Sequence, residues 1–414
     1  MDRKKRIAII FGGQSTEHEV SRFSAESIIK NIDRDKFDVA MIGITRDGTW
    51  LSYDGPVEKI GTGEWEGLAV RKLLERKVHK PYISRGGEGE ESRTMDGGRS
   101  GESKQSCAIE IGQGKNSEES SLLDVVSNIR ELAKEDIESE KKSIDVVFPV
   151  LHGCNGEDGT IQGLFELASV PYVGSGVLGS ALAMDKAYAK MLFERENIPT
   201  ASFLVFNRKA LTEDIENVIA KIEDTFEYPC FIKPANAGSS VGVTKARNRE
   251  MLREGLNFAA RFDRKILVEE FIDGREVECA VLGNDEPAAS TVGEIVPCNE
   301  FYDYNAKYID DKSKIIIPAD LPESTIETIR QYAVKAFLAL DCAGLARVDF
   351  FVCRKTGKVY INEINTLPGF TKISMYPQLW EASGLPYREL ISRLIELAIE
   401  RFEDNRREIE YRGK

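Results

Sequence analysis

Short apolar runs alternate with amphipathic stretches in the first part of the chain. The run 7–11 predicts a buried β-strand that ends at Gly12-Gly13, and a helix is expected from near Thr16 or Val20 to Ile32. Further strands are expected at 38–44 and 144–150. Strands that alternate with helices predict an α/β fold that begins with a doubly wound, parallel-sheet unit.

The remainder of the chain is richer in predicted strands. A helix is expected over 185–196, and another helix carries apolar residues at helical spacing between strands at 201–206 and 229–233. Beyond residue 265 the pattern predicts strands at 266–271, 276–282, 314–317, 347–352 and 359–364, and helices at 323–340 and 386–402. We therefore divide the chain into an N-terminal domain (1–178), a central subdomain (179–264) and a C-terminal subdomain (265–414).

Residues 84–121 differ from the rest in composition. They include eight Gly, eight Ser and seven Glu in 38 positions, with five apolar residues. Such a stretch buries too little apolar surface to offset the entropy lost on ordering. We expect a surface insertion in the N-terminal domain, with a short edge strand at 108–111 as an alternative.

Composition and charge restrict the classes of ligand. The 414 residues are 42% hydrophobic and carry 56 Lys+Arg against 69 Asp+Glu, a formal charge of −13. This balance argues against wholesale disorder, a membrane channel, or nucleic acid as the main partner. An anionic ligand would have to be held by a local cluster of cations and backbone amides.

The cysteines and the N-terminus predict a cytoplasmic location. Seven cysteines form no Cys-x-x-Cys pair, so we expect them to be reduced and mostly buried. The apolar run that follows the basic N-terminus has five residues, which is short for a signal peptide. No run approaches the 18 apolar residues of a membrane span, and no membrane partner is expected.

The first candidate site follows the first strand. Gly12-Gly13 is followed by Gln-Ser-Thr-Glu and lacks the Gly-x-Gly-x-x-Gly fingerprint of a dinucleotide fold. Glu17 would place a negative charge where a pyrophosphate would lie, which suits an ammonium ligand better. The alternative is that Glu17 and Glu19 only complement the dipole of the following helix.

A second glycine-rich loop follows the strand at 144–150. His152 begins the segment His-Gly-Cys-Asn-Gly-Glu-Asp-Gly, at the carboxyl end of a strand, where α/β proteins commonly bind ligands. His152 is therefore a candidate site residue, and a structural, hydrogen-bonded histidine is the alternative.

The strongest nucleotide signal lies after the strand at 229–233. Lys233 supplies a point charge for phosphate, and the loop 238–242 (Gly-Ser-Ser-Val-Gly) offers backbone N–H groups and hydroxyls. The order differs from a P-loop because the lysine precedes the glycines. A Gly/Ser hairpin tip is the alternative for the loop, and an ordinary surface lysine is the alternative for Lys186, which opens the helix at 185–196.

Two predicted strands carry oxygen ligands on one face. Residues two apart in a strand share a face, so Arg347 lies beside Asp349, and Glu363 beside Asn365. If the strands pair as a hairpin through 355–357, three oxygen ligands meet beside an arginine, and such a set suits Mg²⁺ bound to nucleotide phosphates. An exposed polar strand face is the alternative.

The segment 301–308 (Phe-Tyr-Asp-Tyr-Asn-Ala-Lys-Tyr) is rich in aromatic residues and lacks strand alternation. It has the composition of a lid that excludes water from a reactive intermediate. A loop packed by its own aromatic side chains is the alternative.

Together these segments resemble the D-alanine–D-alanine ligase family of the ATP-grasp superfamily. The resemblance covers nearly the whole chain outside 84–121, and six motifs occur in the family's order. They are Gly-Gly-Gln-Ser-Thr-Glu-His-Glu-Val-Ser (12–21), His-Gly-x-x-Gly-Glu-Asp-Gly (152–159), Tyr-Val-Gly-Ser-Gly-Val-Leu-Gly-Ser-Ala-Leu-Ala-Met-Asp-Lys (172–186), Gly-Ser-Ser-Val-Gly (238–242), Phe-Tyr-Asp-Tyr-x-Ala-Lys-Tyr (301–308) and Glu-x-Asn-Thr-x-Pro-Gly-Phe-Thr (363–371).

The resemblance implies two α+β ATP-grasp subdomains after the parallel-sheet domain, ATP as a substrate, and two Mg²⁺ or Mn²⁺ ions per active site. It also implies a role for each site residue. Lys186, Lys233, Ser239 and Ser240 would hold phosphates, Glu269 and Glu276 would address adenine and ribose, and Asp349, Glu363 and Asn365 would bind metal. Glu17 would receive the ammonium of the first D-alanine beside His152, Arg347 and the Gly369 amide would stabilise an oxyanion, Ser374 would bind the second carboxylate, and Lys307 and Tyr308 would arrive on the lid.

The implied reaction joins two D-alanines through an acyl phosphate, for peptidoglycan precursor synthesis. Tyr308 favours an amine acceptor, because relatives that make D-alanyl-D-lactate replace the Tyr-x-Ala-Lys-Tyr pattern of the lid. The alternatives are a ligase that uses another acceptor, such as D-serine or D-lactate, and a non-catalytic nucleotide-binding protein. The family resemblance suggests a homodimer.

Overall fold

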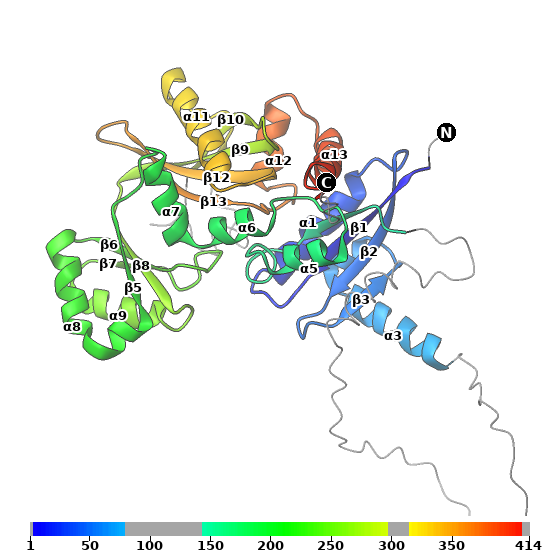
Figure 1. Ribbon diagram of the computed structural model, residues 1–414, viewed down its shortest axis with the longest axis horizontal. Helices are drawn as coiled ribbons and strands as arrows, with labels where there is room; N and C mark the ends of the chain where they lie inside the picture. The colour runs from blue at the N-terminus through cyan, green and yellow to red at the C-terminus, as the bar shows by residue number, and fades with distance from the viewer. Residues whose placement is uncertain (1–2, 79–142, 297–313, 408–414) are drawn as a thin grey trace, which may run out of the picture.

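The computed structural model describes residues 3–78, 143–296 and 314–407, except that the side chains of 76–78 are not described. Three β-sheets of four, five and four strands organise these residues. The chain runs from the first sheet through the smaller antiparallel sheet to the five-stranded sheet, and then returns to the first (Figure 1).

The first sheet has the strand order β3-β2-β1-β4, in which β1 is parallel to both β2 and β4. Alternate residues of β1 face opposite sides, so Ile7 and Ile9 pack toward α1 while Ala8 and Ile10 pack toward α5. Helices on both faces confirm the doubly wound prediction, but the sheet is not wholly parallel, because the edge strand β3 is antiparallel to β2. The elements are β1 (Lys5–Gly12), α1 (His18–Asn31), β2 (Phe37–Ile44), β3 (Trp50–Tyr53), α2 (Glu58–Thr62), α3 (Trp65–Val78), β4 (Val146–Val150) and α5 (Thr160–Ala168).

The central sheet is antiparallel, with the order β5-β8-β6-β7. Cys230 and Ile232 of β6 pack under α8 and α9, while Phe231 and Lys233 point to the opposite face and line a cavity. The two faces of one strand therefore separate the core from the candidate site. The elements are β5 (Phe203–Asn207), α8 (Arg208–Thr225), β6 (Cys230–Pro234), β7 (Thr244–Ala246), α9 (Arg249–Ala259) and β8 (Lys265–Glu270).

Strand pairing differs from the domain limits expected around this central sheet. The limit at 264/265 falls directly before β8, which pairs with both β5 and β6 and so extends the central sheet to Glu270. In addition, α6 (Val177–Met184) and α7 (Lys186–Arg195) bury Ala183, Ala189 and Phe193 in the core of the third sheet. Apolar spacing predicts strands and helices, but not the sheet that each one joins.

The third sheet has the order β11-β10-β9-β12-β13 and is antiparallel throughout. The predicted hairpin of β12 and β13 is confirmed, with Asp349 opposite Glu363 and Arg347 opposite Asn365. Strand β10 was not predicted from the sequence. The elements are β9 (Gly274–Gly283), β10 (Ala288–Val296), β11 (Lys314–Ile316), α11 (Glu323–Ala339), β12 (Gly344–Cys353), β13 (Val359–Asn365), α12 (Met375–Ala382) and α13 (Tyr387–Asp404).

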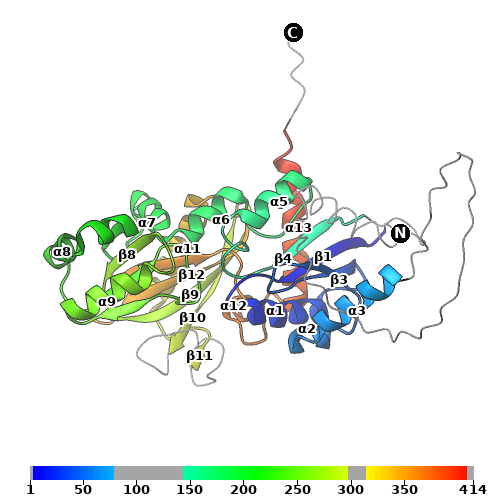
Figure 2. The same cartoon turned by 90° about the horizontal axis from the view of Figure 1, so that it is seen from below.

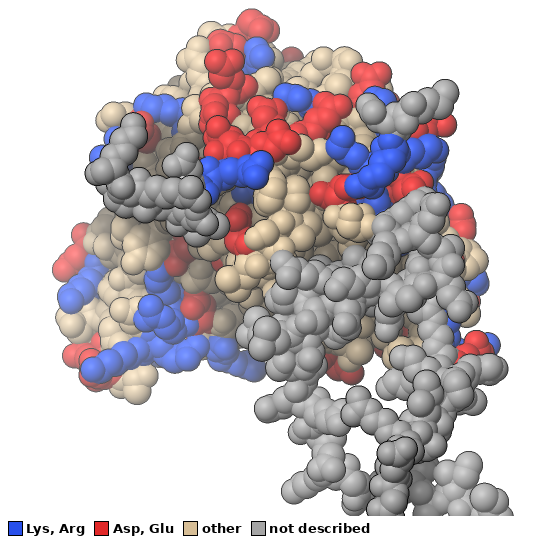
Figure 3. All heavy atoms as spheres, turned by 45° about the vertical axis from the view of Figure 1, so that its right-hand side comes forward, with Lys and Arg blue, Asp and Glu red and all other residues tan. Residues whose placement is uncertain are grey.

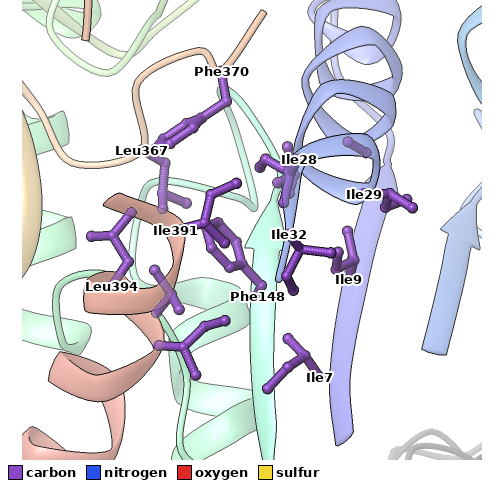
Figure 4. Packing of buried hydrophobic residues seen from close by; sticks show 14 of the residues in the cluster. Ile7, Ile9, Ile28, Ile29, Ile32, Phe148, Leu367, Phe370, Ile391 and Leu394 are labelled. Atoms are coloured by element: carbon purple, nitrogen blue, oxygen red, sulfur yellow. The ribbon is translucent and has the colours of Figure 1, made fainter. Parts of the chain in front are cut away.

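The last helix packs against the first sheet. Helix α13 contacts α1 and β4, and it lies beside them in Figure 2. Ile391 and Leu394 of α13 lie in one buried cluster with Phe148 of β4 and Ile28 of α1 (Figure 4). Because the same cluster includes Leu282 of β9 and Leu345 of β12, it joins the N-terminal domain to the third sheet.

None of the cysteines that the structure describes forms a disulfide, and three of these five are buried. Cys154, Cys230, Cys279, Cys342 and Cys353 are free, whereas Cys107 and Cys298 lie outside the described residues. No helix within the described ranges is long and apolar enough to cross a membrane. On the face shown in Figure 3, acidic and basic side chains gather in separate clusters rather than in one continuous basic surface.

Candidate active site

Two cavities that share part of their walls lie where the three sheets meet. The first is lined by Glu17 and His152 of the N-terminal domain and by Arg347 of β12. The second lies between the central and third sheets. Lys186, Ser239 and Glu363 line both cavities, so the two are neighbouring compartments of one site.

The second cavity brings together the residues expected to hold phosphates and metal. Its lining residues include Lys186, Lys233, Ser239, Ser240, Glu269, Glu276, Asp349 and Glu363. They come from segments that are far apart in the chain. The wall carries eight carboxylates against three cationic side chains, so this compartment is acidic overall.

Glu269 is a buried carboxylate held between two lysines. One of its oxygens lies 2.6 Å from Nζ of Lys233, and the other lies 3.0 Å from Nζ of Lys190. Burial alone would raise the pKa of Glu269, but Lys190 and Lys233 outweigh it and lower this pKa to about 2. The pKa of Lys233 is raised, because Glu269 outweighs the effect of burial. Burial lowers the pKa of Lys190, and Glu269 opposes that shift.

This arrangement predicts acid sensitivity of the fold. Because the pKa of Glu269 is lowered in the folded protein from 4.5 to about 2, its contribution, about 3 kcal/mol, is complete above pH 4.5 and is lost as the pH falls toward 2. We expect the melting temperature of the Glu269→Gln variant to fall less between pH 5 and pH 3 than that of the wild type. Thermal unfolding followed by circular dichroism measures the melting temperatures of both proteins. If the two melting temperatures fell equally between pH 5 and pH 3, the lowered pKa of Glu269 would be contradicted.

Helix α7 places Lys186 at the junction of the two cavities. The Asp185 side chain accepts hydrogen bonds from the amides of Ala187 (3.1 Å) and Tyr188 (3.3 Å), which fixes the start of the helix. Nζ of Lys186 donates to the carbonyl of Ala237 (2.8 Å) and lies 3.4 Å from Glu363. Lys186 therefore connects the glycine-rich loop to the carboxylates of the third sheet and is not an ordinary surface lysine.

Three carboxylates form a row across adjacent strands of the third sheet. Asp349 of β12 is opposite Glu278 of β9 on one side and Glu363 of β13 on the other. All three line the second cavity, whereas α11 packs on the opposite face of the sheet. Glu278 could not be identified as a site residue from the sequence, because only the register between β9 and β12 places it beside Asp349.

Arg347 is held by this row. Its Nε and one terminal nitrogen donate to the two oxygens of Asp349, each at 2.7 Å. Nε also lies 3.0 Å from a carboxylate oxygen of Glu278. The guanidinium is thus fixed by neighbouring carboxylates while it lines the first cavity.

The donor set fits a divalent cation whose ligands come partly from the protein and partly from a substrate. Glu363 and Asn365 line the first cavity, and Asp349 and Glu363 line the second. Within the part of the chain that the structure describes, no group of three or more His, Cys, Asp or Glu residues forms a metal cage. Two carboxylates and an amide oxygen match Mg²⁺, which commonly takes one or two carboxylates together with substrate phosphates.

Glu17 lies at the start of α1 but does not cap it. Its side chain makes no capping hydrogen bond to the helix and instead accepts one from Ser239 of the glycine-rich loop. A Cβ at Gly153 would lie 2.7 Å from Glu17, and one at Gly238 would lie 3.0 Å from it. Two glycines thus allow two loops to approach this carboxylate, an arrangement that a role limited to the helix dipole does not require.

His152 is buried and hydrogen-bonded at the wall of the first cavity. Its Nδ1 lies 2.9 Å from the carbonyl of Leu367 and 3.7 Å from Glu157, and its Nε2 lies 3.4 Å from Ser24. Burial lowers the pKa of His152, but Glu157 and then Glu17 outweigh it, and the pKa is raised. His152 therefore has the hydrogen bonds of a structural histidine and a position in the candidate site.

The turn after β13 completes the first cavity. Gly369 and Ser374 line it, and the Ser374 hydroxyl accepts a hydrogen bond from the amide of Thr371 (2.9 Å). The predicted lid residues Lys307 and Tyr308 lie outside the described residues. Lys190 and Glu278 belong to the site or support it, but no motif in the sequence included them. Glu157 lies within the segment 152–159, but the sequence suggested no separate role for it.

Comparison with known proteins identifies relatives of the whole chain. The family model described as "D-ala D-ala ligase N-terminus" matches residues 6–175, and the one described as "D-ala D-ala ligase C-terminus" matches residues 192–396. The protein named D-alanine–D-alanine ligase from Ruminiclostridium cellulolyticum is 60% identical over 98% of both chains. Its namesake from Acetivibrio thermocellus is also 60% identical, over 99% of both chains.

Solved structures show the same similarity. The VanG D-Ala:D-Ser ligase from Enterococcus faecalis has a TM-score of 0.72 and 36% identity, covering 96% of this chain and 100% of its own. The D-alanine–D-alanine ligase from Coxiella burnetii has a TM-score of 0.72 and 33% identity, covering 97% of this chain and 96% of its own.

Proposed function

Because the chain belongs to the D-alanine–D-alanine ligase family, we propose that its site joins two D-alanines at the expense of ATP, in the synthesis of peptidoglycan precursors. The observation that carries the proposal is the placement of Lys233, Asp349 and Glu363 around one cavity. That cavity adjoins the one lined by Glu17, His152 and Arg347. A site for phosphates thus lies beside a site for a small zwitterion.

The second cavity is the proposed ATP compartment. Lys186, Lys233 and the hydroxyls of Ser239 and Ser240 would attract and orient the phosphates, and Glu269 and Glu276 would accept hydrogen bonds from adenine and ribose. The glycine-rich loop suits this role because Ser239 and Ser240 both adopt positive φ values (48° and 58°), a turn in which successive amides can face an anion.

The first cavity is the proposed D-alanine compartment. Glu17 would bind the ammonium of the first D-alanine beside His152, and Ser374 would bind the carboxylate of the second. A carboxylate is a poor electrophile, so ATP would first convert the carboxylate of the first D-alanine to an acyl phosphate. The amine of the second D-alanine would then attack, and phosphate would leave. Arg347 and the Gly369 amide would stabilise the tetrahedral oxyanion, while the lid residues Lys307 and Tyr308 would help to exclude water.

The family uses a divalent cation, and this donor set fits Mg²⁺ or Mn²⁺. Asp349, Glu363 and Asn365 are the residues that would hold the cation. We propose that each active site binds two such ions. The bound cation would neutralise part of the phosphate charge and so reduce the repulsion between the phosphates and the acidic wall of the second cavity. Cationic side chains of this chain at the same cavities, Lys186 and Arg347, would position the reacting groups.

Phosphate release tests the proposal directly. Protein mixed with Mg-ATP and D-alanine is expected to release one phosphate for each dipeptide formed, whereas a non-catalytic nucleotide-binding protein would release none. ATP consumption without dipeptide would also contradict the proposal.

Acceptor choice is the second measurement. The similarity to a D-Ala:D-Ser ligase makes D-serine a specific alternative acceptor. A coupled assay with D-alanine alone, and with D-serine or D-lactate added, is expected to give D-alanyl-D-alanine as the main product. A higher kcat/KM for D-serine or D-lactate would assign the chain to a different acceptor.

We also propose a cytoplasmic homodimer, since the precursors are made where ATP is available and the family resemblance suggests two subunits. Light scattering coupled to size-exclusion chromatography is expected to give twice the mass of the 414-residue chain.

A further inference from the structure

Lys190 is a lysine whose charged end lies inside the protein. It follows Lys186 by four residues on α7, and its side chain is only 2% exposed. Lysine is almost never fully buried unless it is paired, and Nζ of Lys190 lies 3.0 Å from Glu269. Unlike Lys186 and Lys233, Lys190 is not part of the wall of either cavity.

The partner of Lys190 is shared with a lysine that does line the second cavity. Glu269 contacts Lys190 through one oxygen and Lys233 through the other. Nζ of Lys233 also lies 3.3 Å from the amide oxygen of Asn362, which belongs to the same wall. A single carboxylate thus connects an ammonium behind the wall with one in the wall.

The charges of these three groups determine what the wall offers to an anion. Two lysines and one carboxylate leave one net positive charge, whereas Glu269 and Lys233 alone would form a neutral pair. Since carboxylates outnumber cations in the rest of this wall, the loss of that one charge would leave no net positive charge beside Lys233 to offset them.

We propose that Lys190 is a positioning residue for the nucleotide, which neutralises Glu269 from behind the wall so that the charge of Lys233 remains available to the phosphates. The inference rests on the proposed function, since it takes the second cavity as the ATP compartment. Lys190 itself contacts no substrate. Its effect should therefore depend on the charge of the ligand and not on the adenosine part.

The test compares the binding of adenosine, ADP and ATP by isothermal titration calorimetry, with Mg²⁺ present and D-alanine omitted. Lys190→Gln removes the charge but keeps a hydrogen-bond donor, and Glu269→Gln removes the opposite charge. We expect the ratio of ATP affinity to adenosine affinity to fall at least about tenfold in Lys190→Gln. The ratio should be maintained or raised in Glu269→Gln and return toward the wild-type value in the double variant.

The ratio separates this role from a purely structural one. A structural role for Lys190 would weaken adenosine and ATP equally, and an unchanged ratio in a folded Lys190→Gln variant would overturn the proposal. If Lys190→Gln does not fold, comparing Glu269→Gln with the double variant isolates the same charge, because no unpaired carboxylate is then left buried. In that comparison the double variant should show the lower ratio, and equal ratios would overturn the proposal.

Two further variants complete the series. Lys190→Arg keeps the charge and should keep the ratio. Arg249→Gln removes a cation of α9 that pairs with Glu216 (3.0 Å) away from both cavities, and it should leave the ratio unchanged. Failure of the wild type to bind ATP would contradict the proposed function itself, whereas wild-type binding with an unchanged ratio in Lys190→Gln would contradict only the role of Lys190.

Discussion

Replacing Arg347 by alanine is expected to lower kcat by at least about 100-fold, the effect of losing one oxyanion donor. The guanidinium is fixed by Asp349 and lies within 3.0 Å of Glu278, so little reorganisation is needed when charge develops on the substrate. A donor oriented in advance stabilises the transition state more than the ground state. We therefore expect kcat to fall more than the KM for either substrate rises, as measured by steady-state phosphate release.

Arg347→Lys is the matched variant. It keeps the positive charge but loses the planar pair of nitrogens that holds both oxygens of Asp349. Its kcat should lie between those of the wild type and Arg347→Ala. A near-normal kcat in Arg347→Ala would remove this residue from the mechanism.

Replacing Glu363 by glutamine is expected to lower kcat/KM for ATP by at least about 100-fold and to raise the Mg²⁺ concentration needed for half-maximal activity. Glu363 lines both cavities, is opposite Asp349, and lies 3.4 Å from Lys186. Loss of a group that merely orients a metal ligand typically costs about 10–100-fold, so loss of a ligand should cost at least as much. Activity titrated with Mg²⁺, together with Mn²⁺ binding followed by electron paramagnetic resonance, measures both effects.

Glu270→Gln controls for the loss of charge alone. Glu270 lines the second cavity and accepts a hydrogen bond from the amide of Ser202 (2.8 Å), but it lies on β8, outside the strand pair that carries the proposed metal ligands. The substitution Glu270→Gln removes one negative charge from the same compartment. We expect the Mg²⁺ requirement of this variant to stay close to that of the wild type. Equal effects of the two substitutions would show that the site responds to overall charge rather than to a specific ligand.

Most of the individual strands and helices could be predicted from the sequence. The apolar run 7–11 falls within β1, and the helix expected to end at Ile32 is α1, which ends at Asn31. The hairpin of β12 and β13 could also be predicted, because one short turn separates two alternating strands whose polar residues share a face. Local periodicity was sufficient in these cases, since each element's buried face is encoded within the element itself.

Several elements were not predicted, including the helices α3 and α9 as well as strands that depend on distant partners. Strand β10 lies between β9 and β11 in the third sheet, but its run Ala-Ala-Ser-Thr-Val-Gly is too weakly apolar to show in the sequence. The assignment of β8 to the central sheet and of α7 to the third core likewise depended on pairing and packing, which apolar spacing does not encode.

The sequence by itself determined which residue types this protein has available for chemistry, because glycine-rich loops, lysines at the ends of strands and alternating carboxylates are local patterns. Only the tertiary structure decided which charges neutralise one another. Glu269 holds two lysines, and Asp349 holds Arg347 within a row of three carboxylates. The physical reason is that electrostatic interactions depend on distance and burial in space, and β6, β8 and α7 approach one another only when the sheets have formed.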